Sequence, residues 1–451
     1  MNKKQITNGL LWIFAIGQFG WSLLSGVVSN WMVYYYTGSP DANNPNTGIF
    51  ATGITQEPIL FKLTLFGLVL AVGRIFDAIT DPLIAGWSDG SNFKGGRRIP
   101  FMRAVAIPFA LATIGLFTLP QTGNIVVNDL VLFILLMVFY LFMTIFCTPY
   151  NALIAELGDT QEHRINVSTY ISFTFIVGQS ISFMLPNVAS MFEGAVGQAG
   201  SIRLAVAIMA GIACIAMLIP SFYINERAYI ESKPSQTKAF SSLLKTFSVR
   251  QFRRFVYSDV IYFFALTLFQ TGLAFYETKL MEIEDTWTFV LTATMTFISV
   301  CLYPVVNKLA PKVGKKTLIV IGFFSYAAVF LITSLCGKGL HWGFIIAVTA
   351  AIPMAILGIL PQACVADVAE WNRLETGEDR SGMFFAARTF AFKMGQAIAM
   401  VVFTSVTVAK TPASYRASAV IATITCLIGA CLFLMYNENM ILKKIDELKK
   451  G

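Results

Sequence analysis

The sequence predicts an all-α integral membrane protein with twelve transmembrane helices, arranged as two pseudo-symmetric halves of six. Three observations predict this class. Apolar residues make up 56% of the 451 residues and charged residues only 13%, whereas a soluble domain is about 25% charged. Ten stretches without Asp, Glu, Lys or Arg can cross, or nearly cross, a bilayer, which needs roughly 17 to 25 apolar residues. Finally, several motifs recur about half a chain length apart.

Two further stretches are as apolar as these ten, although they contain charged residues. The first holds Arg74, Asp77 and Asp81, and the second holds Arg388 and Lys393. The twelve expected spans are residues 5–40, 60–87, 104–128, 130–155, 165–192, 204–225, 260–276, 286–307, 317–337, 339–366, 382–409 and 417–437.

The distribution of basic residues predicts the orientation. With the N-terminus inside, 24 of the 33 Lys and Arg residues fall in cytoplasmic segments, six fall outside and three fall within the spans. Short loops rich in Lys and Arg remain in the cytoplasm. We therefore expect a multi-pass protein of the cell membrane, in a bacterium the inner membrane, with both termini cytoplasmic. The net charge of +8 arises in these loops, so nucleic-acid binding is not expected.

The repeat divides the chain. "KGGRR" at 94–98 and "KVGKK" at 312–316 lie 218 residues apart, and "ALIAEL" at 152–157 resembles "ACVADV" at 363–368. Each of the latter pair is followed by a helix containing "VGQSIS" or "MGQAIA". We expect a six-helix half over 1–225, a cytoplasmic central loop over 226–253, and a six-helix half with a short tail over 254–451. Such repeats are typical of secondary transporters.

The charged residues of the first of these two stretches follow a helical spacing. Arg74, Asp77 and Asp81 are spaced i, i+3 and i+7, so a helix places them on one face. A carboxylate facing lipid costs about 2.5 kcal/mol or more, so this face should point into the protein. Two carboxylates one turn apart repel each other and readily take up a cation or a proton. The alternative is a purely structural ion pair with Arg74.

A family resemblance follows from two segments. "RIFDAITDPLIAGWSDGSNFKGGRRIPF" and "RLETGEDRSGMFFAARTFAFKMGQ" resemble the glycoside-pentoside-hexuronide:cation symporter family, which is melibiose-permease-like and belongs to the major facilitator superfamily. The resemblance implies secondary active symport of a sugar or glycoside, acidic ones included, by alternating access. It implies Na⁺ or H⁺ as coupling cation, no other cofactor, a lipid environment and function as a monomer.

The resemblance also implies site residues. The cation would be bound by Asp77, Asp81, Thr144 and Lys393, with no metal beyond a possible Na⁺ at the two aspartates. The resemblance implies that Thr80 replaces an Asn of the best-known family member at a position that influences cation choice, which leaves Na⁺ and H⁺ both open. The substrate-site candidates are Gln18, Ser22, Cys147, Asn151, Arg388 and Thr389.

Two of these candidates bear on specificity. Ser22 and Cys147 stand where the family prototype has acidic sugar ligands, so galactoside specificity is not expected. Arg388, taken as an unpaired guanidinium in the membrane, suits a carboxylate or sulfonate. Its alternative role is a gating or helix-packing salt bridge.

The loops after the second and eighth spans predict a cytoplasmic gate. We expect carboxylate–cation pairs there to stabilise one access state. The gate residues are Asp89, Arg97, Arg98, Lys315 and Lys316.

Other functions fit the sequence less well. An intramembrane aspartyl protease needs its two aspartates on different helices, whereas Asp77 and Asp81 share one, so we expect no enzyme. A channel is disfavoured by the two-fold repeat with a charged midplane. The main alternative is a sodium-coupled carrier of lysolipids or other amphiphiles with the same fold, which would need a wide apolar lateral opening.

Overall fold

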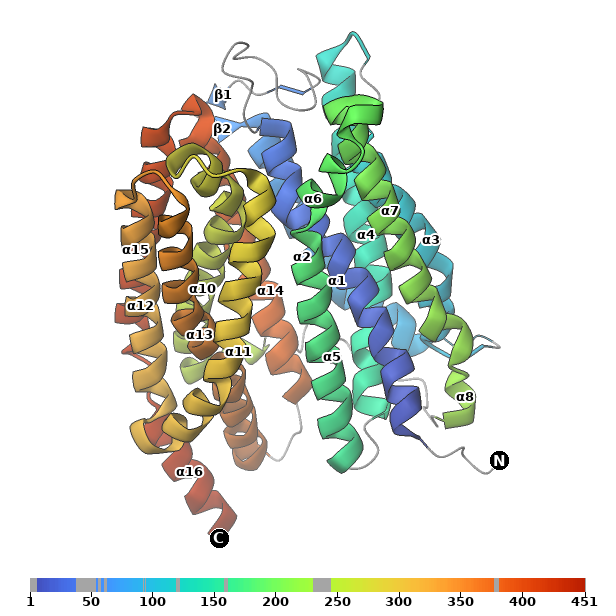
Figure 1. Cartoon of the computed structure of the whole chain (residues 1–451). Helices are drawn as coiled ribbons and strands as arrows, with labels where there is room; N and C mark the ends of the chain where they lie inside the picture. The colour runs from blue at the N-terminus through green and yellow to red at the C-terminus, as the bar shows by residue number, and fades with distance from the viewer. Residues whose placement is uncertain are drawn as a thin grey trace. The chain divides into compact units, whose positions relative to one another are not determined.

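A computed structural model gives the fold and describes most of the chain (Figure 1). The described residues are 6–37, 54–55, 58–60, 63–91, 93, 95–118, 122–157, 161–229, 245–376 and 381–450. They form two compact units, of which unit 1 comprises Met1–Gln56 with Ile79–Thr237 and unit 2 comprises Glu57–Ala78 with Lys238–Gly451. Helix α2, Leu65–Gly90, begins in unit 2 and ends in unit 1.

The regular elements of unit 1, within its described part, are helices joined by turns and one isolated β-bridge between Phe93 and Gly96. Its helices are α1 (Asn8–Thr37), α3 (Ile99–Phe117), α4 (Ile125–Leu157), α5 (Gln161–Ser182), α6 (Leu185–Ser190), α7 (Glu193–Tyr223) and α8 (Glu226–Tyr229).

Unit 2 adds a short antiparallel hairpin, β1 (Pro58–Leu60) with β2 (Leu63–Thr64), to its helices. A π-helix, η1 (Tyr276–Leu280), extends its first long helix, and two 3-10 turns, η2 (Asp285–Trp287) and η3 (Thr407–Ala409), flank others. The α-helices are α10 (Arg250–Phe275), α11 (Thr288–Val313), α12 (Lys315–Leu335), α13 (Leu340–Thr376), α14 (Ser381–Val406), α15 (Pro412–Phe433) and α16 (Glu438–Lys450).

Ten of the described helices are long and apolar enough to cross a membrane. The remaining two expected spans, α2 and α5, are helices of 26 and 22 residues. Their hydropathy is lower because α2 carries four charged residues and α5 is rich in hydroxyl and amide side chains. Both are long enough to span about 30 Å at 1.5 Å per residue.

The two units repeat the same helix pairings. In unit 1, α1 packs against α5 and α7, and α3 packs against α4 and α7. In unit 2, α10 packs against α14 and α15, and α12 packs against α13 and α15. These pairings match one to one when α1 is equated with α10, so the repeat in the sequence is also a repeat in packing.

A glycine explains one repeated motif. In "VGQSIS", a Cβ on Gly178 of α5 would lie 2.7 Å from the carbonyl oxygen of Phe19 on α1. In "MGQAIA", a Cβ on Gly395 of α14 would lie 2.4 Å from the carbonyl oxygen of Val260 on α10. Only glycine permits so close an approach of the two helices, as is common between membrane helices.

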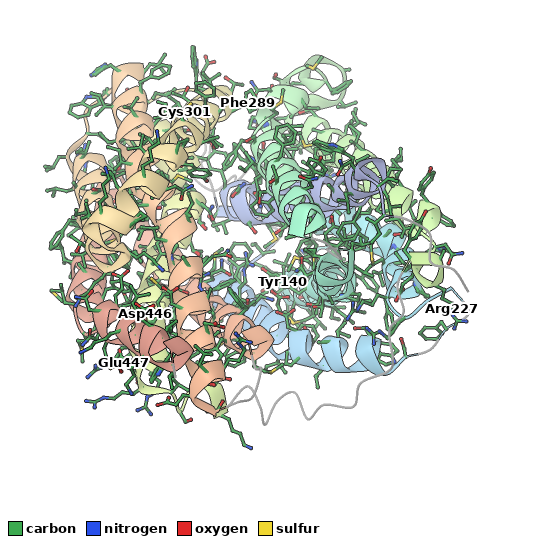
Figure 2. The ribbon with its side chains drawn as sticks, turned by 90° about the horizontal axis from the view of Figure 1, so that it is seen from below. Tyr140, Arg227, Phe289, Cys301, Asp446 and Glu447 are labelled. Carbon is green, nitrogen blue, oxygen red and sulfur yellow. The ribbon has the colours of Figure 1, made fainter. Side chains whose placement is uncertain are left out.

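Each unit ends in a short helix after its last long one. Figure 2 labels Arg227 on α8 of unit 1, and Asp446 and Glu447 on α16 of unit 2. Helix α16 packs on α13 through its apolar face, where Ile441 and Ile445 are buried.

Candidate cation and substrate sites

Helix α2 has a polar face and an apolar face. Asp77 has no exposed surface, and Arg74 and Thr80 are also buried. The opposite face exposes large apolar side chains, including Val72 and Ile79. Because a helix advances 100° per residue, the two sets lie on opposite sides of α2. The charged stripe therefore faces the protein, and the apolar stripe is suited to lipid.

Asp77 has a cationic partner within unit 2. The Nζ atom of Lys393, on α14, lies 2.8 Å from Oδ2 of Asp77, and the lysine side chain is largely buried. Two opposite charges at this distance in an apolar setting compensate for much of the cost of removing each from water. The structure thus brings together two of the residues that the sequence assigned to the cation.

In unit 1, hydroxyl groups of α4 contact the C-terminal part of α2, from Ile79 onward. The hydroxyls of Thr80 and Thr144 lie 3.3 Å apart. The hydroxyl of Thr148 lies 3.4 Å from Oδ1 of Asp81, at the long limit for a hydrogen bond. Thr144 and Thr148 are four residues apart, so α4 presents both to α2. Thr148 extends the set that the sequence predicted.

The substrate-site candidates of unit 1 differ in accessibility. Ser22 is fully buried, donates to the carbonyl of Phe19 at 3.1 Å, and lies against Gly178 where α1 meets α5. Gln18 is buried and accepts a hydrogen bond from the indole of Trp21 at 3.1 Å. On α4, Asn151 is exposed and Cys147 half-buried.

The expectation of an unpaired guanidinium at Arg388 is wrong. Its Nε and Nη2 atoms donate to the two carboxylate oxygens of Asp259, on α10, at 2.8 and 2.9 Å. The two side chains are only 8% and 3% exposed. The two N–H groups of Arg388 that could bind the carboxylate of a substrate in a bidentate manner are therefore bonded to Asp259. The neighbouring Thr389 hydroxyl donates to the carbonyl of Phe385 at 3.0 Å.

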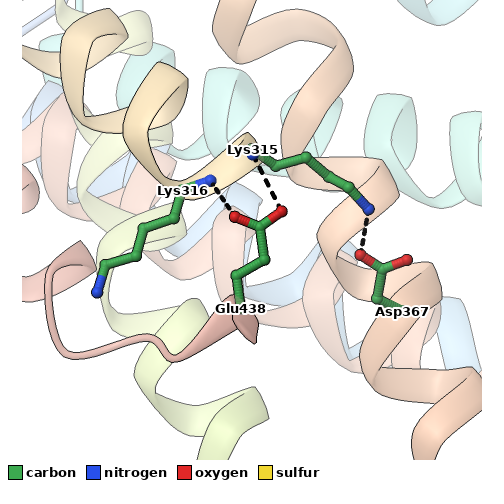
Figure 3. A network of polar contacts seen from close by, with 4 residues as sticks. All are labelled: Lys315, Lys316, Asp367 and Glu438. Atoms are coloured by element: carbon green, nitrogen blue, oxygen red, sulfur yellow. Dashed lines mark hydrogen bonds and ion pairs between the residues drawn. The ribbon is translucent and has the colours of Figure 1, made fainter. Parts of the chain in front are cut away.

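The residues of unit 2 that the sequence predicts for the gate make contacts within the unit (Figure 3). The ammonium of Lys315 forms an ion pair with Asp367 of α13. The backbone N–H groups of Lys315 and Lys316, which begin α12, donate to the carboxylate of Glu438 at 3.0 and 2.8 Å. The residue before them, Gly314, has φ +91°, which favours glycine.

The gate residues of unit 1 show the same arrangement. The backbone N–H of Arg98 and that of Ile99, at the start of α3, donate to Oε2 of Glu226 at 2.8 and 3.0 Å. Gly96 has φ +119°. Arg97 and Arg98 are themselves buried. The side chain of Asp89 lies outside the described residues, so its place in the gate stays a prediction.

The family comparison agrees with this fold. The model of the family described as MFS/sugar transport protein matches residues 13–447. The chain belongs to this family. As a major facilitator it is a multi-pass membrane transporter and not an enzyme, and the resemblance to the glycoside-pentoside-hexuronide:cation symporters is confirmed.

Several relatives of this major facilitator carry symporter or transporter names. An uncharacterized symporter of Synechocystis sp. is 34% identical over 30% of this chain and 28% of its own length. The isoprimeverose transporter of Lactiplantibacillus pentosus is 23% identical over 85% of this chain and 77% of its own length. The sodium-dependent lysophosphatidylcholine symporter 1 of Xenopus tropicalis is 24% identical over 78% of this chain and 73% of its own length.

A solved structure of a bacterial homologue of the human drug peptide transporters PepT1 and PepT2 shares the major facilitator fold. Its TM-score is 0.69 at 12% identity, covering 98% of this chain and 100% of that chain.

Sequence reasoning missed three kinds of partner in this facilitator. Asp259 was overlooked because it immediately precedes an apolar stretch rather than interrupting one. Glu226 and Glu438 each follow an asparagine just after the last long helix of a unit, and this repeated Asn-Glu pair was a usable signal. Thr148 was visible as the second threonine of a pair spaced i, i+4.

Proposed function

We propose that this protein is a cation-coupled symporter that moves a sugar or glycoside across the cell membrane by alternating access. Asp77 and Asp81 bind Na⁺ or H⁺, and hydroxyls of α4 assist at Asp81. Both termini are cytoplasmic, the protein works as a monomer, and the pairs at the starts of α3 and α12 belong to a cytoplasmic gate.

The ion pair of Asp77 with Lys393 is the observation that supports this proposal most. Its length is 2.8 Å, and Asp77 is fully buried. In the absence of a coupling cation, the ammonium of Lys393 neutralises Asp77. Na⁺ or a proton at Asp77 makes that ammonium redundant and frees Lys393 to move. Because cation and lysine compete for one carboxylate, binding of the cation shifts the conformational equilibrium.

The substrate assignment rests on the relatives and on the accessible polar groups. The family description and an isoprimeverose transporter among the relatives support a sugar. Of the residues expected at the substrate, Cys147, Asn151 and Thr389 keep exposed surface and remain the candidates, whereas Gln18 is buried beside Trp21. Ser22 is enclosed between α1 and α5, and Arg388 is occupied by Asp259. We therefore expect no preference for acidic sugars.

A second function has one supporting observation. Lysophosphatidylcholine symporters of three vertebrates match 74 to 78% of this chain at 22 to 24% identity. A sodium-coupled carrier of lysolipids would use the same pair of aspartates. The two functions differ in cargo and not in the cation site.

Uptake into proteoliposomes tests the proposal. Purified protein is supplied with a panel of labelled glycosides and a labelled lysolipid, under an imposed Na⁺ or H⁺ gradient. In Asp77→Asn and Asp81→Asn, gradient-driven accumulation should fall at least about ten-fold, because the amide lacks the charge that binds the cation. Exchange of substrate without a gradient should persist.

Asp446→Asn is the matched control, since Asp446 is exposed on α16. Wild-type accumulation in both Asp77→Asn and Asp81→Asn would refute the cation site. Accumulation of the lysolipid alone would select the second function.

A further inference from the structure

A buried carboxylate of unit 2 that the sites described above do not include lies at the end of α10. Glu277 is 1% exposed and belongs to the π-helix η1 that extends α10. Short π-helices occur frequently at functional sites, because the widened turn re-aims a side chain. An ionisable group within a membrane segment is costly and marks a candidate site.

Two hydroxyl groups of α11 accompany Glu277. The hydroxyl of Thr288 donates to Oε2 of Glu277. Thr292 lies one helical turn further, so α11 presents both threonines on one face. Thr292 is 5% exposed, and its hydroxyl has no hydrogen-bond partner in the part of the chain that the structure describes. A buried hydroxyl without a hydrogen-bond partner is unfavourable, and a bound ligand would satisfy it.

A small cavity lies between these groups. Glu277 and Thr292 line it together with apolar residues of α10, α11 and α13, such as Leu273 and Ala347. Its volume is about 10 Å³, close to the space that one water molecule needs. Among its described lining residues, Glu277 is the one charged group. The nearby Lys338 pairs with Glu282 at 2.6 Å, and both are exposed, so neither fills the cavity.

We propose that this cavity binds a monovalent cation of the size of Na⁺, held by the carboxylate of Glu277 and the hydroxyls of Thr288 and Thr292. Hard oxygen donors around one negative charge match a hard cation of single charge. A divalent ion is a poorer match, because Ca²⁺ takes six to eight oxygen ligands and Mg²⁺ demands an octahedral set. The site is distinct from Asp77 and Asp81 and does not depend on their role.

Binding of ²²Na⁺ to the purified full-length protein tests the site. Ionic strength is held constant with choline chloride, so that general screening does not change. Glu277→Gln should remove one bound Na⁺ per chain while Asp77→Asn leaves that ion in place. Thr292→Val keeps the shape of the side chain and should weaken binding of the same ion about ten-fold. If Glu277→Gln does not fold, the weaker Na⁺ binding of Thr292→Val is by itself sufficient to support the site.

The matched control is Thr294→Val on the same helix. Thr294 is half-buried and its hydroxyl already donates to the carbonyl of Val290 at 2.8 Å, so Na⁺ binding should be unchanged. If Thr292→Val and Glu277→Gln both bind as much Na⁺ as the wild type, the cavity holds water and the proposal is wrong. If Asp77→Asn binds as much Na⁺ as the wild type while Glu277→Gln loses one ion, the site proposed here stands and Na⁺ is excluded as the coupling ion at Asp77, which leaves H⁺.

Discussion

At the scale of single residues, the pair formed by Arg388 and Asp259 joins two helices of unit 2. The guanidinium lies 5.8 and 5.6 Å from the ring centroids of Phe255 and Phe263, within the range of cation–π attraction. With two hydrogen bonds to Asp259 and two aromatic neighbours, Arg388 is held between α10 and α14. We infer that it joins these helices and does not bind substrate.

Removal of one member of this pair should destabilise unit 2. Arg388→Gln leaves the Asp259 carboxylate buried without its partner, at a cost of about 3–5 kcal/mol. The double variant Asp259→Asn, Arg388→Gln replaces two charges by two amides and should recover most of that loss. Thermal unfolding of the purified proteins in one detergent measures both effects.

The double variant also separates packing from recognition. If it is stable and transports neutral and acidic glycosides in the wild-type ratio, Arg388 has no substrate role. A selective loss of acidic glycosides in a stable double variant would show that the guanidinium binds the anion.

The residues of α2 were predictable from the sequence because charges that interrupt an apolar helix must face inward. Their partners were only partly predictable. Lys393 could be identified because it interrupts an apolar stretch. Asp259 could not, because it lies at the end of an apolar stretch and does not interrupt it. The pairing of Arg388 with Asp259 depends on how α14 packs against α10, and no local pattern encodes that contact. For the same reason the sequence could not reveal that Ser22 is enclosed by Gly178.

At the scale of elements, the same contact occurs in both units. A glutamate that follows the last long helix of the unit accepts hydrogen bonds from the backbone N–H groups at the start of another helix of that unit. Glu226 accepts from the first N–H groups of α3, and Glu438 accepts from those of α12. These N–H groups have no partner within their helices, and the helix dipole attracts a negative charge there. The basic loops were predicted to form a cytoplasmic gate, but the sequence did not reveal that a glutamate of the same unit accepts hydrogen bonds from their backbone N–H groups.

Truncation of these glutamates should weaken the unit that contains them. Glu438→Ala and Glu226→Ala each remove two charge-assisted hydrogen bonds and should cost about 2–3 kcal/mol of unfolding free energy. Glu447→Ala is the control, because its carboxylate is 63% exposed and 3.9 Å from Lys443, a geometry that contributes little. Thermal unfolding again provides the measurement, and an equal melting temperature for Glu438→Ala and Glu447→Ala would contradict the capping role.

At the scale of the whole molecule, the sequence repeat and the helix pairings agree, since α1, α3, α4, α5 and α7 pair as α10, α12, α13, α14 and α15 do. The class and most helices were predictable, since apolar length alone identifies a membrane span. The short hairpin of β1 and β2 and the π-helix η1 were not, because they depend on packing around the ends of the helices. The grouping of residues 57–78 with unit 2 likewise follows from contacts such as Gly67 with Thr404.

The orientation of both units in the membrane follows from charge and can be tested directly. The positive-inside bias predicts that α16 is cytoplasmic and that the loop containing Lys338 is external. The exposed native thiols Cys301 and Cys431 are first replaced by serine. In that background, Glu447→Cys should react with a membrane-impermeant maleimide in inside-out vesicles and not in intact cells. Lys338→Cys, whose parent side chain is 72% exposed, should show the opposite pattern. The basic loops after α2 and α11, which contain the proposed gate, are predicted on the same side of the membrane as α16. The reverse labelling pattern would therefore place the gate outside the cell and show that its assignment to the cytoplasm is wrong.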